Sequence, residues 1–239
     1  MKFIHTGDIH WGMCPDADKP WGKERAQAIK DTFRKIVEKA KELDVDCMFI
    51  SGDLFHRQPL MKDLKEVNYL FSTIPGVKVI LIAGNHDKIR GNSALLSFTW
   101  SPNVTWLMDE TLTSVYFEDI NTEVYGFSYH TTEIKEARLE DIQVPLNSRI
   151  QILMAHGGDA AHLPINFNSL EPVSYTHLDV YKRQPLSFPA RKLIDLTREC
   201  MRNHPELDYT AFRFCRPEEV ENLTKVNHTA ASRRLSSFR

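Results

Sequence analysis

The feature that most constrains this fold is a series of short apolar runs, each ending in a loop of glycine and polar residues. Residues 2–5, 47–50 and 77–83 have the composition of buried strands. Between them, apolar residues recur at helical spacing over 24–43 and again around 62–72, with charged residues on the opposite face. Strands that alternate with amphipathic helices are typical of an α/β fold, in which helices cover a sheet.

The pattern changes after residue 103. Shorter runs of alternating polarity follow at 104–107, 114–117 and 123–127, and they predict a second, more antiparallel sheet. A further apolar run at 150–155 predicts one more buried strand. We therefore expect an α/β protein built as a two-sheet sandwich flanked by helices.

Composition narrows the class of protein. A chain of 239 residues with 42% hydrophobic residues is large enough to bury a core. The four cysteines have no CxxC spacing, and no long apolar segment suggests a leader or a membrane anchor. A net charge of −2 argues against a wholly basic, nucleic-acid-coating surface, although a local basic stripe is compatible with it. The sequence predicts a soluble, reduced, cytoplasmic protein without membrane contact.

The loops that end the apolar runs carry metal-ligand side chains. In layered α/β folds this edge of the sheet is where ligands and catalytic groups gather. Carboxylate, imidazole and amide oxygen together suit a pair of divalent ions such as Mn²⁺. Two ions about 3.5–4 Å apart activate water and clamp the oxygens of a phosphate. A single Asp-x-His loop is more often a turn with a satisfied histidine. The candidates come from four loops in order: Asp8, His10, Asp53, Asn85, His86 and His156.

Four motifs carry a resemblance to a known family. GDIHWG, GDLFHRQP, GNHD and MAHGG resemble the ordered signature of calcineurin-like metallophosphoesterases. Within that superfamily they are most similar to SbcD-type DNA repair exonucleases, the bacterial relatives of the eukaryotic meiotic-recombination nuclease. The resemblance covers residues 1–172.

The resemblance implies roles for these residues. Asp8 and His10 would bind a first metal ion, Asp53 would bridge two ions, and Asn85 and His156 would bind the second. His86 would be the general acid beside the scissile phosphate, a task that suits a proton labile near neutral pH. His56 would lie near the DNA path, where protein phosphatases of the superfamily carry aspartate; alternatively it only supports a metal ligand.

The same resemblance implies the reaction and the partners. The parent protein would hydrolyse phosphodiester bonds in DNA with two ions, most simply Mn²⁺, in the context of DNA repair. Its partners would be DNA, a coiled-coil ATPase of the SbcC type and a second copy in a homodimer. Two alternatives remain open: a small-molecule phosphodiesterase or phosphatase on the same fold, and a non-catalytic scaffold.

The pattern breaks after residue 172. The family's Gly-His-x-His loop, which supplies a last ligand to each metal, has no counterpart in the chain, so we expect a truncated domain over 1–172 with impaired activity. Residues 173–184 can be encoded by an inverted repeat that resembles two joined mosaic ends of the transposon used in sequencing-library preparation. We therefore interpret 173–184 as an adapter-derived junction and 185–239 as an unrelated tail. Alternatively, 173–184 is a strand-like insertion in which His177 replaces a missing ligand.

Overall fold

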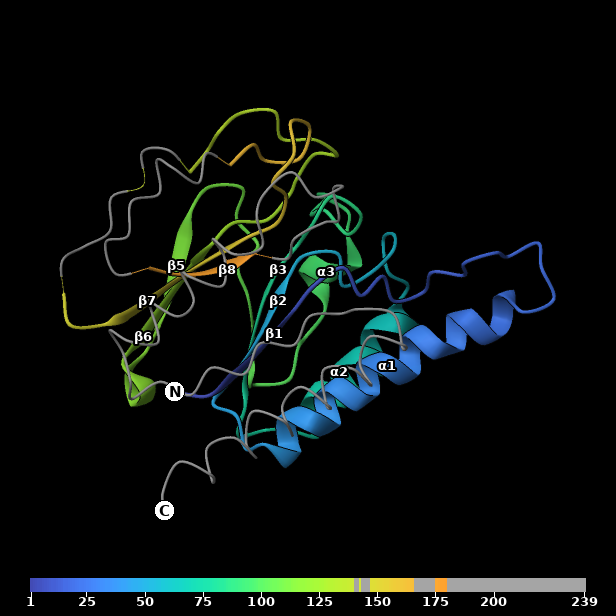
Figure 1. Ribbon diagram of the computed structural model, residues 1–239, viewed down its shortest axis with the longest axis horizontal. Coiled ribbons are helices and arrows are strands. Elements are labelled where there is room, and N and C mark those ends of the chain that lie inside the picture. The colour runs from blue at the N-terminus through green and yellow to red at the C-terminus, as the bar shows by residue number, and fades with distance from the viewer. Residues whose placement is uncertain (140–141, 143–146, 166–174, 180–239) are drawn as a thin grey trace, which may run out of the picture.

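The chain folds into two four-stranded sheets in a computed structural model that describes residues 1–139, 142, 147–165 and 175–179 (Figure 1). The predicted two-sheet α/β fold is confirmed. The first sheet has the order β1-β2-β3-β4, with strands Phe3–Thr6, Cys47–Ser51, Lys78–Ile82 and Val104–Trp106. The second has the order β5-β6-β7-β8, with strands Thr113–Phe117, Thr122–Gly126, Ile150–Ala155 and Tyr175–Asp179.

Two long helices, α1 (Gly22–Glu42) and α2 (Met61–Ser72), connect the first three strands and lie side by side against the first sheet (Figure 1). Each begins with an acidic residue in its first turn, and α1 ends with Lys39 and Lys41, which complement the helix dipole. The buried face of α1 is formed by Phe33, Val37 and Ala40. A short helix, α3 (Ala94–Ser97), and a 3₁₀ turn at Glu118–Ile120 complete the helical elements of the described residues.

Alternating side chains of the first sheet belong to two different clusters of the core. On β2, Met48 and Ile50 pack with the helices, whereas Cys47 and Phe49 pack toward the second sheet. Strand β7 contributes Ile152 to the layer between the sheets. The first sheet is therefore covered on both faces, which explains why β2 and β3 are continuous apolar runs.

Two details of the second half differ from the sequence prediction. Strand β4 belongs to the first sheet, parallel to β3, although its alternating pattern suggested the second sheet. The second sheet is mixed: β5 and β6 are antiparallel, but β7 lies parallel to β6 and β8 parallel to β7. A parallel neighbour needs a crossover of about a dozen residues or more, and the long segment between Gly126 and Ile150 supplies one.

Residues 175–179 form strand β8, in which His177 is in register with Leu153 of β7. A strand in this segment agrees with the strand-like alternative for 173–184, while the junction hypothesis concerns the gene and stays a prediction. The rest of 173–184 and the tail 185–239 lie outside the described residues. None of the helices that the structure describes has an apolar stretch sufficient to cross a membrane.

Candidate metal centre

The exit loops of β1, β2 and β3 meet at one edge of the first sheet because these strands are parallel neighbours. Backbone hydrogen bonds continue beyond the strands: the amide of Asp8 donates to the carbonyl of Gly52 at 3.1 Å, and that of His10 to the carbonyl of Asp53 at 2.9 Å. The predicted ligands of the first and second loops are thereby fixed beside each other.

Three of these residues have left-handed backbone conformations that non-glycine residues rarely adopt. Asp8, His10 and Asp53 have φ angles of 50°, 53° and 52°. Such conformations cost free energy and persist where the surrounding structure enforces them, often at functional sites. Here the left-handed turns belong to the three residues predicted to share one metal ion.

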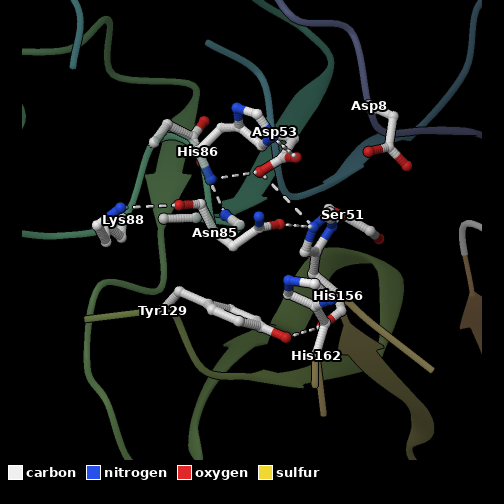
Figure 2. Close-up of polar contacts among 12 residues, drawn as sticks. Asp8, Ser51, Asp53, Asn85, His86, Lys88, Tyr129, His156 and His162 are labelled. Carbon is white, nitrogen blue, oxygen red and sulfur yellow. Dashed lines mark hydrogen bonds and ion pairs between the residues drawn. The ribbon is translucent and has the colours of Figure 1, made fainter. Parts of the chain in front are cut away.

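Asp53 is the centre of the cluster, with Figure 2 showing its carboxylate between His86 and His156. Its side chain is fully buried. Oδ1 accepts the backbone N–H of His86 at 3.0 Å and lies 3.6 Å from Nε2 of His156. Oδ2 lies 3.7 Å from Nε2 of His10 but has no hydrogen-bond partner within the described part of the chain. A buried carboxylate oxygen without a hydrogen bond is costly, and a bound cation would satisfy it.

Two glycines allow this close approach. A Cβ on Gly84 would lie 2.1 Å from Oδ1 of Asp53, and a Cβ on Gly52 would lie 2.5 Å from Nδ1 of His156. Gly52 also has a φ of +85°. The absence of a Cβ at these two positions therefore lets the loops turn and the ligand side chains approach.

Asp8, His10 and Asp53 form one group of possible metal ligands, with ligand atoms within 4.8 Å of one another. His10, His56 and His86 form a second such group. Burial acts to lower the pKa of His10, but the Asp8 carboxylate beside it and the charges of Asp53 and Asp8 outweigh burial and raise the pKa. The carboxylates of Asp8 and Asp53 therefore favour a positive charge beside His10.

His156 enters the site from the second sheet and is almost completely buried. Its Nδ1 lies 2.9 Å from the carbonyl oxygen of Ser51, so Nδ1 must carry the donated proton. Its Nε2 lies 3.1 Å from Oδ1 of Asn85. The Tyr129 hydroxyl donates to the backbone carbonyl of His156 at 2.9 Å (Figure 2). The imidazole is thus oriented as metal-binding histidines usually are, with one nitrogen anchored and the other directed into the site.

His86 and His56 lie on the open side of the cluster. Nδ1 of His86 donates to the backbone carbonyl of His56 at 3.0 Å, and its Nε2 lies 4.0 Å from Oδ2 of Asp53. The two rings stack, with centroids 5.1 Å apart. Burial lowers the pKa of His56, and the nearby His10 and His86 lower it further. The structure therefore gathers every predicted site residue at one place.

Sequence reasoning missed Asp87, although the GNHD motif contained it. Its carboxylate is fully buried, Oδ2 accepts the N–H of Phe55 at 3.0 Å, and Oδ1 accepts the N–H of Gly84 at 2.7 Å. Burial raises the pKa of Asp87 to about 7, and the negative charge of Asp53 contributes in the same direction. Ser51 and Tyr129 were also missed, because a carbonyl or hydroxyl that orients a histidine leaves no signature in a sequence.

The fold and this cluster define a metallophosphoesterase. The model of the calcineurin-like phosphoesterase family matches residues 1–203, and the chain belongs to this family. The match extends beyond residue 172, where the motif-based resemblance ends.

Three curated relatives are described as DNA double-strand break repair protein Mre11. The protein of Archaeoglobus fulgidus is 37% identical over 92 residues, covering 37% of this chain and 20% of its own. That of Methanocaldococcus jannaschii is 28% identical over 177 residues, covering 70% of this chain and 46% of its own. That of Haloferax volcanii is 34% identical over 97 residues, which cover 39% of this chain and 21% of the length of that protein. The chain spans less than half the length of these relatives.

Proposed function

We propose that the parent protein hydrolyses phosphodiester bonds of DNA in repair, with two divalent ions, most simply Mn²⁺. The observation that carries the proposal is the cluster of carboxylate, imidazole and amide ligand atoms around the buried, partly unsatisfied carboxylate of Asp53. The donor set fits divalent metal ions: Asp8 and His10 would hold one ion, Asn85 and His156 the other, and Asp53 both. Bound there, the ions would supply Lewis-acid chemistry for a phosphate and activate water.

His86 fits the role of general acid. The carbonyl of His56 holds Nδ1 and fixes the ring, so that Nε2 faces the cluster. The side chain is 38% exposed and can exchange protons with solvent. A proton on Nε2 would then be available to the leaving oxygen of a phosphodiester bound beside Asp53. The stack of His56 on His86 keeps the two rings together, in accordance with a place for His56 near the DNA path.

A basic pocket supports DNA as the substrate. A cavity of about 460 Å³ opens beside His86 and Asn85, and its lining includes three cationic side chains, Arg57, Lys88 and Arg90. Phosphates that flank a scissile bond in a nucleic acid would meet these cations, whereas a small phosphomonoester has no such neighbours. The description of the relatives as DNA double-strand break repair proteins also favours DNA.

The proposal includes the partners and the location that the resemblance implies. An SbcC-type coiled-coil ATPase and a second copy of the chain are the proposed protein partners, and the cytoplasm is the proposed location. Because the 239 residues contain no Gly-His-x-His sequence, we also propose that this chain turns over DNA poorly.

The test uses the full chain with Mn²⁺, an end-labelled linear duplex and a chromogenic phosphodiester. We expect Mn²⁺ binding, DNA binding and at most slow cleavage that His86→Ala abolishes, with His130→Ala as the control. His130 is a suitable control because its ring pairs with the carbonyl of Met108 and belongs to neither group of possible metal ligands. Cleavage of the chromogenic diester without binding or cleavage of DNA would contradict the assignment of DNA. Rapid DNA turnover, lost in His86→Ala, would contradict the predicted impairment.

A further inference from the structure

Asp87 connects two loops that carry the proposed metal ligands. Its carboxylate accepts one backbone N–H from each loop: Phe55 on the exit loop of β2 and Gly84 at the start of the exit loop of β3. Both donors are on the main chain, so their positions fix the paths of the loops rather than the rotamer of one side chain. We propose that Asp87 is a positioning residue for the metal centre, an inference that rests on the proposed function.

The contact with Gly84 reaches Asp53. The hydrogen bond from the Gly84 amide to Asp87 holds Gly84 against the Asp53 carboxylate. Gly84 can lie there because it has no Cβ. Two residues further on, the amide of His86 donates to Oδ1 of Asp53. Asp87 thereby holds the loop that orients the carboxylate of Asp53, which both proposed ions would share. Among the described contacts, Asp87 has no direct hydrogen bond to Asp53, so it acts through the backbone of the loop.

The contact with Phe55 reaches the loop of Asp8 and His10. Phe55 pairs with Trp11 in an isolated parallel bridge. The amide of Trp11 donates to the carbonyl of Leu54, and the amide of His56 donates to the carbonyl of Trp11. Since Trp11 directly follows His10, the position of Phe55 is transmitted to the first loop through the backbone.

A carboxylate is the group that this position requires. Its two oxygens accept from two separate N–H groups, whereas an asparagine offers one oxygen and places an NH₂ donor against the other N–H. A buried carboxylate near Asp53 is electrostatically unfavourable. A residue that served only the packing of this region would therefore be better neutral, so a carboxylate at this position points to a role in the geometry of the loops.

The experiment measures binding of Co²⁺ and Mn²⁺ to the full chain by calorimetry, together with the visible absorption of the Co²⁺-saturated protein. For Asp87→Asn we expect affinity to fall about 10-fold to 100-fold, the range for removal of groups that orient metal ligands. We also expect a changed Co²⁺ spectrum at saturation, which a loss of stability alone does not produce. Asp63→Asn is the matched control, because Asp63 also accepts a backbone N–H, from Leu60, but at the start of α2.

The outcomes separate the inference from the proposed function. A folded Asp87→Asn variant with wild-type affinity and spectrum would overturn the positioning role and leave the metal centre intact. A wild-type chain that binds neither ion would overturn the metal centre and the inference with it. If circular dichroism shows Asp87→Asn unfolded, Asp87→Glu carries the same test, because it keeps the charge and misplaces the oxygens. If neither variant folds, Asp87 supports the whole fold and the positioning role is wrong.

Discussion

Nε2 of His156 lies 3.1 Å from Oδ1 of Asn85, although 71 positions separate the two residues. The Ser51 carbonyl accepts from Nδ1 of His156, so in a neutral imidazole Nε2 carries a lone pair. A lone pair on nitrogen and a lone pair on oxygen then face each other across this distance. Two acceptors in such an arrangement are stabilised by a cation, and both atoms are ligands that divalent metals use.

Replacement of Asp53 by asparagine should separate folding from metal binding. In the metal-free protein, Asp53→Asn removes a buried negative charge whose Oδ2 lacks a hydrogen bond, so we expect the free energy of unfolding to rise by about 1–3 kcal/mol. Added Mn²⁺ should stabilise the wild type and no longer stabilise the variant. Urea unfolding with EDTA and with Mn²⁺ measures both effects. The exposed Asp18, changed to asparagine, should alter neither, and a less stable metal-free Asp53→Asn would contradict the prediction.

Gly84→Ala should weaken both the fold and the metal centre. The new Cβ would lie 2.1 Å from Oδ1 and 2.7 Å from the backbone nitrogen of Asp53, so the two loops must separate. We expect a loss of about 1–3 kcal/mol in unfolding free energy, as for other overpacked sites, and weaker Mn²⁺ binding. Gly76→Ala is the control, because a Cβ there meets nothing within 4 Å. Equal stability and affinity of the two variants would refute the role of Gly84.

His5 should make stability depend on pH. Burial lowers the pKa of His5 to about 4, from 6.5. The unfolded chain therefore binds the proton first as pH falls, so stability is full above pH 6.5 and decreases down to about pH 4. The shift corresponds to about 3 kcal/mol as an order of magnitude. Urea unfolding of the metal-free protein at several pH values, for the wild type and His5→Gln, isolates this contribution. If the free energies of unfolding of the two proteins change with pH in the same way, His5 does not make this contribution.

The basic pocket should contribute phosphate contacts. If Arg90 meets a backbone phosphate, Arg90→Ala should weaken DNA binding regardless of sequence and reduce the slope of log affinity against log salt by about 0.9 for duplex DNA. Fluorescence anisotropy over a salt series provides the measurement. Lys39→Ala is the control, because Lys39 lies on α1 and pairs with Glu42. An unchanged slope for Arg90→Ala would place the DNA elsewhere.

The junction hypothesis has its own test at the level of the gene. We expect nucleotide sequencing of the source DNA across codons 165–190 to show an inverted repeat over codons 173–184. The repeat would support an adapter-derived junction. A continuous native reading frame without the repeat would defeat the hypothesis, and β8 would then be a native strand of the second sheet.

Much of the fold could be predicted because its signals are local. Strands β1, β2 and β3 are apolar runs, α1 and α2 have a helical period, and all five lie within one or two residues of their predicted bounds. The sheet that contains β4 and the direction of β7 could not be predicted, because pairing depends on distant crossovers. The candidate ligands were found through their position after strands. Asp87 was not, because its importance comes from the backbone amides of Phe55 and Gly84, which any residue except proline would supply.

The left-handed backbone conformations of Asp8, His10 and Asp53 reduce the conformational stability of this protein. An L-residue in that region costs about 1–2 kcal/mol that glycine avoids, so glycine at these positions would relieve that backbone cost. The same exchange would strip two carboxylates and an imidazole from the cluster. Directed evolution that selects for heat resistance alone would therefore favour variants that have lost the metal ligands. A screen on this chain needs metal binding as a second criterion.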